Sequence, residues 1–208
     1  TEPGATPKHQ EELLTTFADQ AVIAIENVRL FKELEARNRD LTVSLDRQTA
    51  TGEILSAISS SPTDTGPVFD VIVRNAMRLL KAGQCALVGF DGKMMSLLAV
   101  LNYDRPEGEE AMRRAFPMPP NRGSTTGRSI LDRAVVHVAD VMQDPDYAFR
   151  AVAQASEFRS VLVIPMLREG EPMGAIAVAR NAPGLFPDSQ VALLKTLADQ
   201  AVIAIENV

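Results

Sequence analysis

The chain has 208 residues, of which 46% are hydrophobic and 23% are charged, and its formal net charge is -6. These proportions are typical of a folded globular protein and argue against a disordered chain or a nucleic-acid-binding surface. Apolar runs such as 161–167 are far shorter than the roughly 20 residues of a membrane span, and the single cysteine, Cys85, excludes an internal disulfide and a cysteine-rich metal site.

A repeated segment lies near each end of the chain. Residues 13–28 read LLTTFADQAVIAIENV and residues 193–208 read LLKTLADQAVIAIENV, so fourteen of sixteen positions are identical. Such a repeat indicates two copies of one structural unit. We therefore expect the chain to begin with the last helix of one domain and to end with the last helix of a second, related domain. The repeat also indicates a piece of a longer, multi-domain protein. The polar opening TEPGATPKHQ has no signal-peptide pattern, and with a single cysteine we expect a cytoplasmic location.

The connector after the first copy is expected to be one long helix, because residues 8–60 contain no proline and a single glycine. Its heptad pattern predicts an imperfect coiled-coil dimer that can shift between registers. The expected contact positions include Phe31, Leu34, Asn38, Leu41 and Leu45. Asn38 either fixes a parallel, in-register dimer by pairing with its symmetry mate or frays and bends an exposed helix.

The remaining residues alternate between helix and strand patterns. A turn at 61–67, with Pro67 in the first turn of the helix that follows, should open the segment, and Asp91-Gly92 is a strong hairpin signal. In chain order we expect a helix from about 67 to 83, strands at 85–90 and 93–101, and a short charged helix at 107–115. A loop at 116–127 should run into a helix that ends near 133, followed by a strand at 134–141 and an irregular helical segment at 144–156. The chain should then form strands at 160–167 and 173–179 and a closing helix from about 188. This order predicts an α+β domain with an antiparallel sheet of about five to six strands, backed by helices on one face.

The closing helix is apolar over most of its circumference, with one narrow polar stripe. Its apolar positions predict a second dimer contact, because they follow the four-then-three spacing of a coiled coil. These positions are Leu194, Ala198, Ala201, Ile205 and Val208. The alternative is that the helix is buried within its own domain.

Several motifs resemble those of GAF domains. The stretches RSVLVIPM at 159–166 and GEPMGAIAVAR at 170–180 are similar to the core of that family, and FPDSQVALLKTLADQAVIAIENV resembles its closing helix. The resemblance covers 62–208. It makes 1–28 the end of a preceding GAF domain and 29–61 a linker like those between tandem GAF domains of bacterial histidine kinases and nucleotide cyclases.

The resemblance implies a sensory or regulatory module, often a homodimer, that passes a signal through its end helices to a downstream output domain. Some family members bind cyclic nucleotides, bilins, haem or small metabolites in a pocket over the sheet. This chain departs from the best-known ligand classes: Cys85 has no adjacent histidine, no NKFDE-type pattern is present, and a single cysteine cannot reduce methionine sulfoxide. No cofactor is therefore assigned.

Three functions remain open at this stage. A sensor of a small ligand and a spacer that dimerises without binding anything are the two main readings. An independent catalyst is the weakest, because the sequence has no Walker loop, nucleophile elbow or HExxH motif.

The candidate ligand residues gather in two stretches. The segment 121–128 places hydroxyl groups at a helix start, where backbone N–H groups can hold an anion; the alternative is a capped turn with solvated arginines. The aromatic residues that follow could line a pocket mouth or pack in the core. The residues meant are Ser124, Thr125, Thr126, Arg128, Tyr147 and Phe149.

The second group surrounds the strand that begins at Ser160. Asp140 is either a ligand-facing carboxylate or a turn cap, and Arg159 with Ser160 either reaches a pocket or pairs with Asp140. His137 alternates with two valines and is expected to be an ordinary half-exposed strand histidine.

Overall fold

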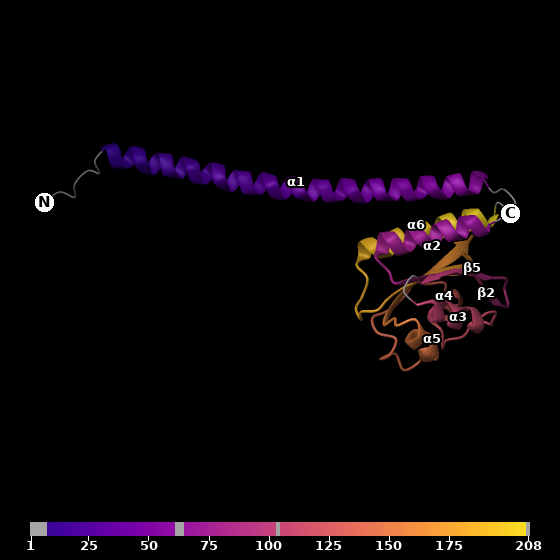
Figure 1. Ribbon diagram of the computed structural model, residues 1–208. Coiled ribbons are helices and arrows are strands. Elements are labelled where there is room, and N and C mark those ends of the chain that lie inside the picture. Colours follow the sequence, from indigo (N-terminus) through magenta and orange to yellow (C-terminus); the bar gives the residue numbers. More distant parts are fainter. Residues whose placement is uncertain (1–7, 61–64, 103–104, 207–208) are drawn as a thin grey trace. The chain divides into compact units, whose positions relative to one another are not determined.

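The computed structural model describes residues 8–60, 65–102 and 105–206 (Figure 1). Residues 61–64 of the turn predicted at 61–67 lie outside the described residues, as does Val208. The chain divides into two compact units, Thr1–Gln48 and Thr49–Val208. None of the helices in the described part of the chain combines the length and the apolarity that crossing a bilayer requires.

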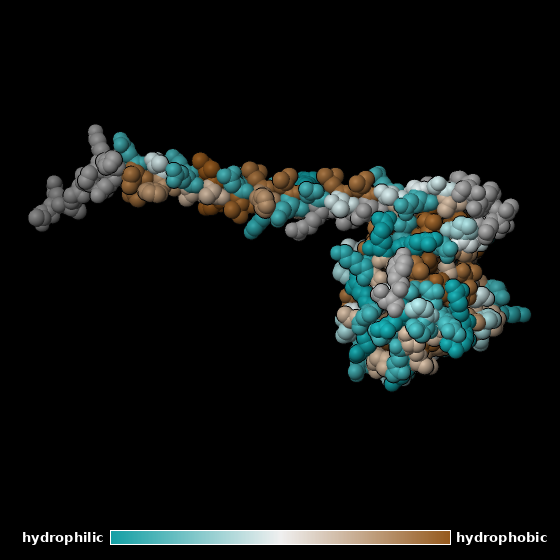
Figure 2. Space-filling model, viewed as in Figure 1, coloured by the Kyte–Doolittle hydropathy of each residue, from teal (hydrophilic) through white to brown (hydrophobic). Residues whose placement is uncertain are grey.

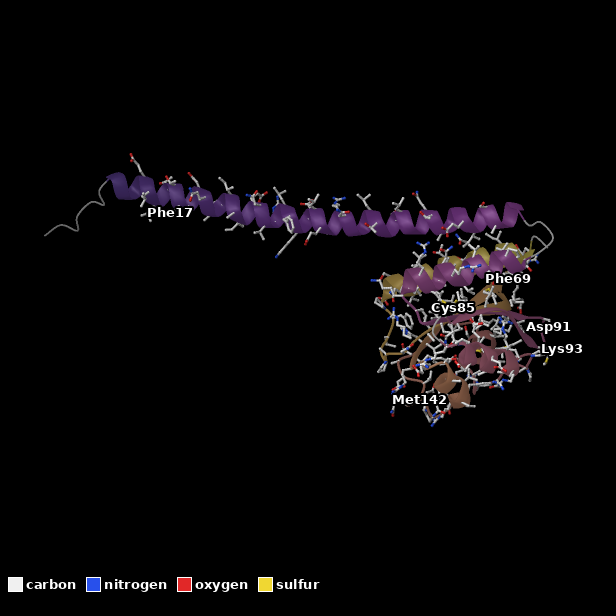
Figure 3. The ribbon with its side chains drawn as sticks, in the orientation of Figure 1. Phe17, Phe69, Cys85, Asp91, Lys93 and Met142 are labelled. Carbon is white, nitrogen blue, oxygen red and sulfur yellow. The ribbon has the colours of Figure 1, made fainter. Side chains whose placement is uncertain are left out.

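The first helix, α1 (Lys8–Ser60), is continuous, which confirms the predicted long helix. Within the first unit the large apolar side chains that the structure describes are exposed to solvent, and brown patches mark them along the helix in Figure 2. Phe17 projects from this part of the helix in Figure 3. The predicted coiled-coil contact residues are exposed too, with exposed fractions of 61% for Phe31, 64% for Leu34, 70% for Leu41 and 64% for Leu45. Asn38 is exposed as well.

The second unit contains the predicted elements in the predicted order. They are α2 (Gly66–Leu80), β1 (Gln84–Phe90), β2 (Met95–Asn102), α3 (Pro106–Ala115), α4 (Thr125–Asp132), β3 (Val136–Val138), α5 (Arg150–Ala155), β4 (Ser160–Arg168), β5 (Glu171–Arg180) and α6 (Asp188–Glu206).

The five strands form one sheet in the order β2-β1-β5-β4-β3, and every neighbouring pair is antiparallel. The β1–β2 hairpin turns where predicted, because the Asp91 carboxylate accepts the N–H groups of Lys93 at 2.8 Å and Met94 at 2.7 Å. Asp91 and Lys93 lie together at this turn in Figure 3. Gly92 takes a φ of +92°, which a glycine adopts without strain.

β3 is shorter than the predicted strand at 134–141. Its three residues pair with Val161 to Val163 of β4. The chain then turns away from the sheet, because the Asp140 carboxylate accepts the N–H of Met142 at 3.0 Å and forms an ion pair with Arg159. These local bonds replace further strand pairing.

Helices cover both faces of the sheet, which corrects the prediction of helices on one face only. α2 and α6 lie on one face, and α3, α4 and α5 lie on the other (Figure 1). Each face has its own apolar core. The second core exists because the segment between β2 and β4 folds back over the sheet and buries residues such as Ile130, Tyr147 and Ala153 against Val161 and Val163.

α6 belongs to the core of its own domain, so the predicted dimer contact is wrong for Leu194, Ala198 and Ala201. Leu194, Ala198 and Ala201 have exposed fractions of 0%, 1% and 0%, and they pack in the core that α2 and the sheet share. Ile205 is partly buried against the same core. The alternative, burial within the domain, is confirmed for these residues. A charge placed at Ala201 would therefore test folding rather than dimerisation.

The last turns of α1 are part of this core. Ala50 and Ile54 are buried, and Gln200 of α6 donates from Nε2 to Thr51 Oγ1 at 2.9 Å. Arg78 Nη2 of α2 lies 3.8 Å from Glu53 Oε2 of α1, within ion-pair distance. The end of α1 is therefore held by both α2 and α6.

The imidazole of His137 holds the segment that leads into α6. Its Nε2 accepts the backbone N–H of Phe186 at 2.6 Å, and the two rings lie 5.5 Å apart. An accepting nitrogen is unprotonated, so the imidazole is neutral. Burial, together with the nearby Arg180 guanidinium, lowers the pKa of His137 from its ordinary 6.5. The expectation of an ordinary strand histidine misses this bond.

A pH dependence of stability follows from this bond. Because the folded-state pKa of His137 is lowered, its contribution to stability is complete above pH 6.5 and is lost as the pH falls below that value. We expect the urea midpoint of the wild type to fall between pH 7.5 and pH 5.5. His137→Gln, whose amide oxygen can accept the same N–H, should lose less of its stability over this interval. Equal losses in both proteins would contradict the assignment.

Candidate functional site

An apolar cavity of about 50 Å³ lies between the sheet and the helices α3, α4 and α5. Its floor consists of alternate residues of β1, namely Gln84, Ala86 and Val88, together with β5 residues near Ala177. Met112, Ala115, Phe116 and Met118 come from α3 and the segment after it, and Tyr147, Phe149, Val152 and Phe158 complete the apolar walls. Among the described residues, no charged side chain lines this cavity.

Strand alternation separates the cavity from the opposite core. Gln84, Ala86 and Val88 point to the cavity side, whereas Cys85 and Leu87 belong to the core under α2 and α6. Figure 3 shows Cys85 near α2, which carries Phe69. Cys85 is fully buried, and burial raises the pKa of its thiol. A buried, protonated thiol is a poor nucleophile, so Cys85 is a packing residue.

The polar part of the lining lies where α4 begins. Ser124 caps this helix, and its Oγ accepts the N–H of Gly127 at 2.8 Å. Ser124, Thr125 and Thr126 all line the cavity and are buried. The start of an α-helix carries N–H groups without intrahelical partners, so this edge favours hydrogen-bond acceptors and anions.

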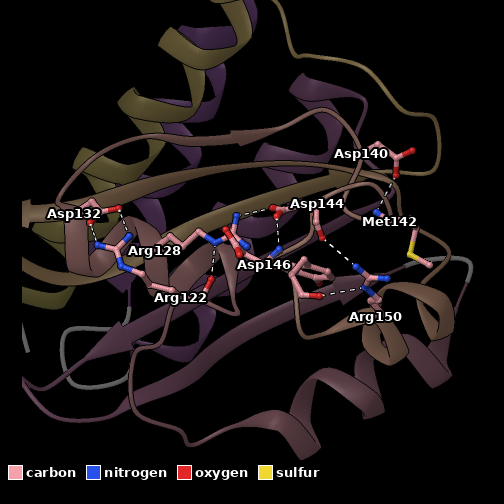
Figure 4. Close-up of polar contacts among 9 residues, drawn as sticks. Arg122, Arg128, Asp132, Asp140, Met142, Asp144, Asp146 and Arg150 are labelled. Atoms are coloured by element: carbon pink, nitrogen blue, oxygen red, sulfur yellow. Dashed lines mark hydrogen bonds and ion pairs between the residues drawn. The ribbon is translucent and has the colours of Figure 1, made fainter.

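Arg128 does not line the cavity; it ties α4 to the segments before and after it through polar contacts with Arg122 and Asp144 (Figure 4). Its Nη1 lies 2.5 Å from Asp144 Oδ2, and its Nε donates to the carbonyl of Arg122 at 2.6 Å. The two paired side chains are only 15% and 12% exposed. The guanidinium lowers the pKa of the Asp144 carboxyl. Burial raises the pKa of the neighbouring Tyr147 phenol.

The second predicted group serves structure rather than the cavity. Arg159 and Asp140 form a bidentate ion pair, in which Arg159 Nε donates to Asp140 Oδ1 at 2.8 Å and Nη2 contacts Oδ2. This confirms the predicted alternative of an Arg159–Asp140 pair. The arginine lowers the pKa of the Asp140 carboxyl. Ser160 is buried and donates to the carbonyl of Ala182 at 2.9 Å.

The structure therefore separates the predicted ligand residues into two sets. Five of them line one cavity: Ser124, Thr125, Thr126, Tyr147 and Phe149. Four do not: Arg128, Asp140, Arg159 and Ser160. The sequence analysis missed Gln84, a buried amide in the cavity floor. The available signal was a polar side chain directly before the apolar run that begins at Cys85.

The fold is similar to several solved structures. The GAF domain of a phosphoenolpyruvate-protein phosphotransferase from Coxiella burnetii superposes with a TM-score of 0.67 and 17% identity, covering 80% of this chain and 94% of that one. The free methionine-R-sulfoxide reductase from Neisseria meningitidis gives a TM-score of 0.62, 17% identity and coverage of 80% and 91%. Residues 122 to 287 of a methyl-accepting chemotaxis protein give 0.59, 24%, and coverage of 74% and 94%. At these identities the likeness shows the shared fold.

Residues 63–206 match the GAF_2 family, described as a GAF domain. The match covers most of the chain and coincides with the sheet, its two helical layers and the cavity. This chain belongs to the GAF domain family, whose members are regulatory or sensory modules of signalling proteins.

Proposed function

We propose that the chain is a sensory and relay module of a bacterial, cytoplasmic, multi-domain signalling protein. Residues 62–208 form its GAF domain, 29–61 a coiled-coil linker, and 1–28 the closing helix of a preceding GAF domain. The working unit is a homodimer joined through α1. A small ligand in the cavity, or a movement of the upstream domain, shifts the dimer between two helix arrangements and sets the activity of an output domain such as a kinase or a cyclase.

The observation that carries this proposal is the contrast along α1. Ala50 and Ile54 are buried, and Ile54 packs in the core under α2 and α6, whereas Leu34 and Leu41 of the same continuous helix are exposed. A second helix that covers the apolar heptad face of a solvent-exposed helix lowers the free energy, because apolar surface leaves water. A movement of this helix would reach the domain through its buried end.

The repeat supports the assignment of residues 1–28. In α6, Leu194, Leu197 and Ala198 are buried in the core under the helical layer. The corresponding residues of the first copy include Leu14 and Phe17, which are exposed. A segment with the same apolar face is suited to the same place on another domain of this kind, which is the basis for a tandem arrangement.

Leu34→Glu is expected to break the dimer. A carboxylate at this position would replace an apolar contact on each helix, which should weaken dimerisation by about 3 kcal/mol, or about a hundredfold. Sedimentation-velocity ultracentrifugation of the wild type and the variant, across a range of concentrations, measures the dissociation constant.

The matched control is Ala36→Glu, which adds the same charge two residues away on a different side of α1. It should leave the dimer intact. A wild type that remains monomeric at about 100 μM would refute the homodimer, since heptad pairs of this length should associate well below that concentration. A dimer that resists Leu34→Glu would place the interface elsewhere.

The second candidate is a spacer that dimerises and transmits movement without binding a ligand. The small size of the cavity favours it, because small-molecule sites usually enclose about 300 Å³ or more and this one encloses about 50 Å³. The two functions make the same prediction for Leu34→Glu and differ only in whether the cavity takes a ligand.

A further inference from the structure

One polar atom in the cavity has no partner. Gln84 is 3% exposed and lines the cavity, and its Nε2 is buried without a hydrogen-bond acceptor. Its Oε1 is 3.5 Å from Asn102 Nδ2, a long contact. A buried amide donor that lacks an acceptor costs free energy, so a site that keeps one is suited to a ligand that supplies the acceptor.

The start of α4 presents donors to the same cavity. Ser124 Oγ already accepts the N–H of Gly127, which leaves the backbone N–H groups and the hydroxyls of Thr125 and Thr126, two lining residues, as donors for a ligand. α4 is eight residues long, and its positive end faces this lining. The cavity therefore has donors from two separate elements and, among the described residues, no carboxylate that would favour a cation.

The geometry points to a small organic acid as the ligand of this cavity: its carboxylate binds Gln84 Nε2 and the start of α4, and its short apolar body packs among Ala86, Val88 and Phe158. This inference rests on the proposed sensory function and names the ligand class for that site. The apolar walls exclude a large polar ligand, and the lack of an acidic lining residue excludes an amine.

The volume sets the size of the acid. A cavity of about 50 Å³ is a small fraction of a typical metabolite pocket, so we expect a ligand of only about six non-hydrogen atoms. Met112 and Met118 in the wall are unbranched and can change rotamer to admit it. Isobutyrate has this size, and isobutanol and isobutylammonium share its carbon skeleton.

The test is an NMR titration of the whole chain with these three probes at constant ionic strength and pH 7. The ¹³C-methyl signals of Met112, Met118 and Ala86 report on the cavity. We expect saturable shifts with isobutyrate, with a dissociation constant in the millimolar range for so small a ligand. Isobutanol should bind at least tenfold more weakly, and isobutylammonium should not shift these signals.

Variants separate the contact from general effects. Gln84→Leu should weaken isobutyrate binding at least tenfold, because a hydrogen bond to a charged group is lost, and should weaken isobutanol binding less, because the hydroxyl loses only a neutral hydrogen bond. The matched control is Asn75→Leu, which removes another buried amide with an unpartnered Nδ2, on α2 under the opposite face of the sheet. It should bind isobutyrate as the wild type does.

Isobutanol binding as tightly as isobutyrate, or Gln84→Leu leaving the isobutyrate affinity unchanged, would overturn the inference. The absence of any shift of the cavity methyl signals with all three probes would also overturn it. None of these results depends on the dissociation constant of the dimer that Leu34→Glu tests. A wrong ligand class can therefore be distinguished from a wrong dimer relay.

Discussion

Gly174→Ala is expected to lower the free energy of unfolding of the GAF domain by about 4 kcal/mol, near the upper end of single-residue effects. Gly174 lies in β5, between Gly89 of β1 and Met166 of β4. A Cβ at this position would come within 2.0 Å of the Val88 carbonyl oxygen and 2.6 Å of Met166 Cε. The carbonyl belongs to the backbone of β1, which pairs on both sides with β2 and β5, so it cannot move away without disturbing the sheet.

Urea unfolding followed by circular dichroism measures this loss. The control is Gly52→Ala in α1, where a Cβ would meet nothing within 4 Å. Because alanine favours a helix over glycine by about 1 kcal/mol, this variant should be slightly more stable than the wild type. The two substitutions are chemically identical, so opposite signs would show that strand packing decides the effect. A Gly174→Ala domain that unfolds at the wild-type midpoint would contradict the tight packing.

Asp144→Asn is expected to lower the free energy of unfolding by about 3 kcal/mol, because it leaves a largely buried guanidinium without an anion. Arg128 Nη2 already has no hydrogen-bond partner, so the side chain depends on the carboxylate for compensation. The pKa of the Asp144 carboxyl is lowered from 3.8. The pair therefore contributes fully above that pH, and its contribution is lost as the pH falls below it.

The matched control is Asp132→Asn in the Arg122–Asp132 pair, whose side chains are 68% and 40% exposed. Water screens that pair, so its loss should lower the free energy of unfolding much less than the loss of the Arg128–Asp144 pair does. Combining Asp144→Leu with Arg128→Met removes both buried charges and should recover most of the stability that Asp144→Asn loses. Equal losses from Asp144→Asn and Asp132→Asn, measured by urea unfolding at pH 7, would mean that burial adds nothing to the first pair.

Much of the fold could be predicted from local patterns. The proline-free stretch before residue 60 became α1, the Asp91-Gly92 pair became the β1–β2 turn, and Asp188 became the first residue of α6. These features depend on residues close together in the chain, so their physical causes are visible in the sequence. The family motifs at 159–166 and 170–180 became β4 and β5, which pair along their whole length.

The errors concern contacts between distant segments. The apolar pattern of α6 is equally consistent with a dimer contact and with a domain core, because periodicity shows that a face is buried but not what buries it. The second helical layer was missed because the segment between β2 and β4 has short helices and irregular loops. In the site, the hydroxyls at the start of α4 were predicted, whereas Gln84 was not, because a polar residue directly before an apolar strand does not show by itself that it lines a cavity.

The sequence by itself determined the elements and the family, because hydrophobic period, turn residues and the repeated closing helix are local or self-similar features. Only the tertiary structure decided which polar groups share a cavity. It placed Gln84 of β1 and Thr125 of α4 around one space, and it used Asp140 and Arg159 in an ion pair away from it. The reason is that a ligand site is defined by distances between residues far apart in the chain, which depend on how the sheet and its two helical layers pack.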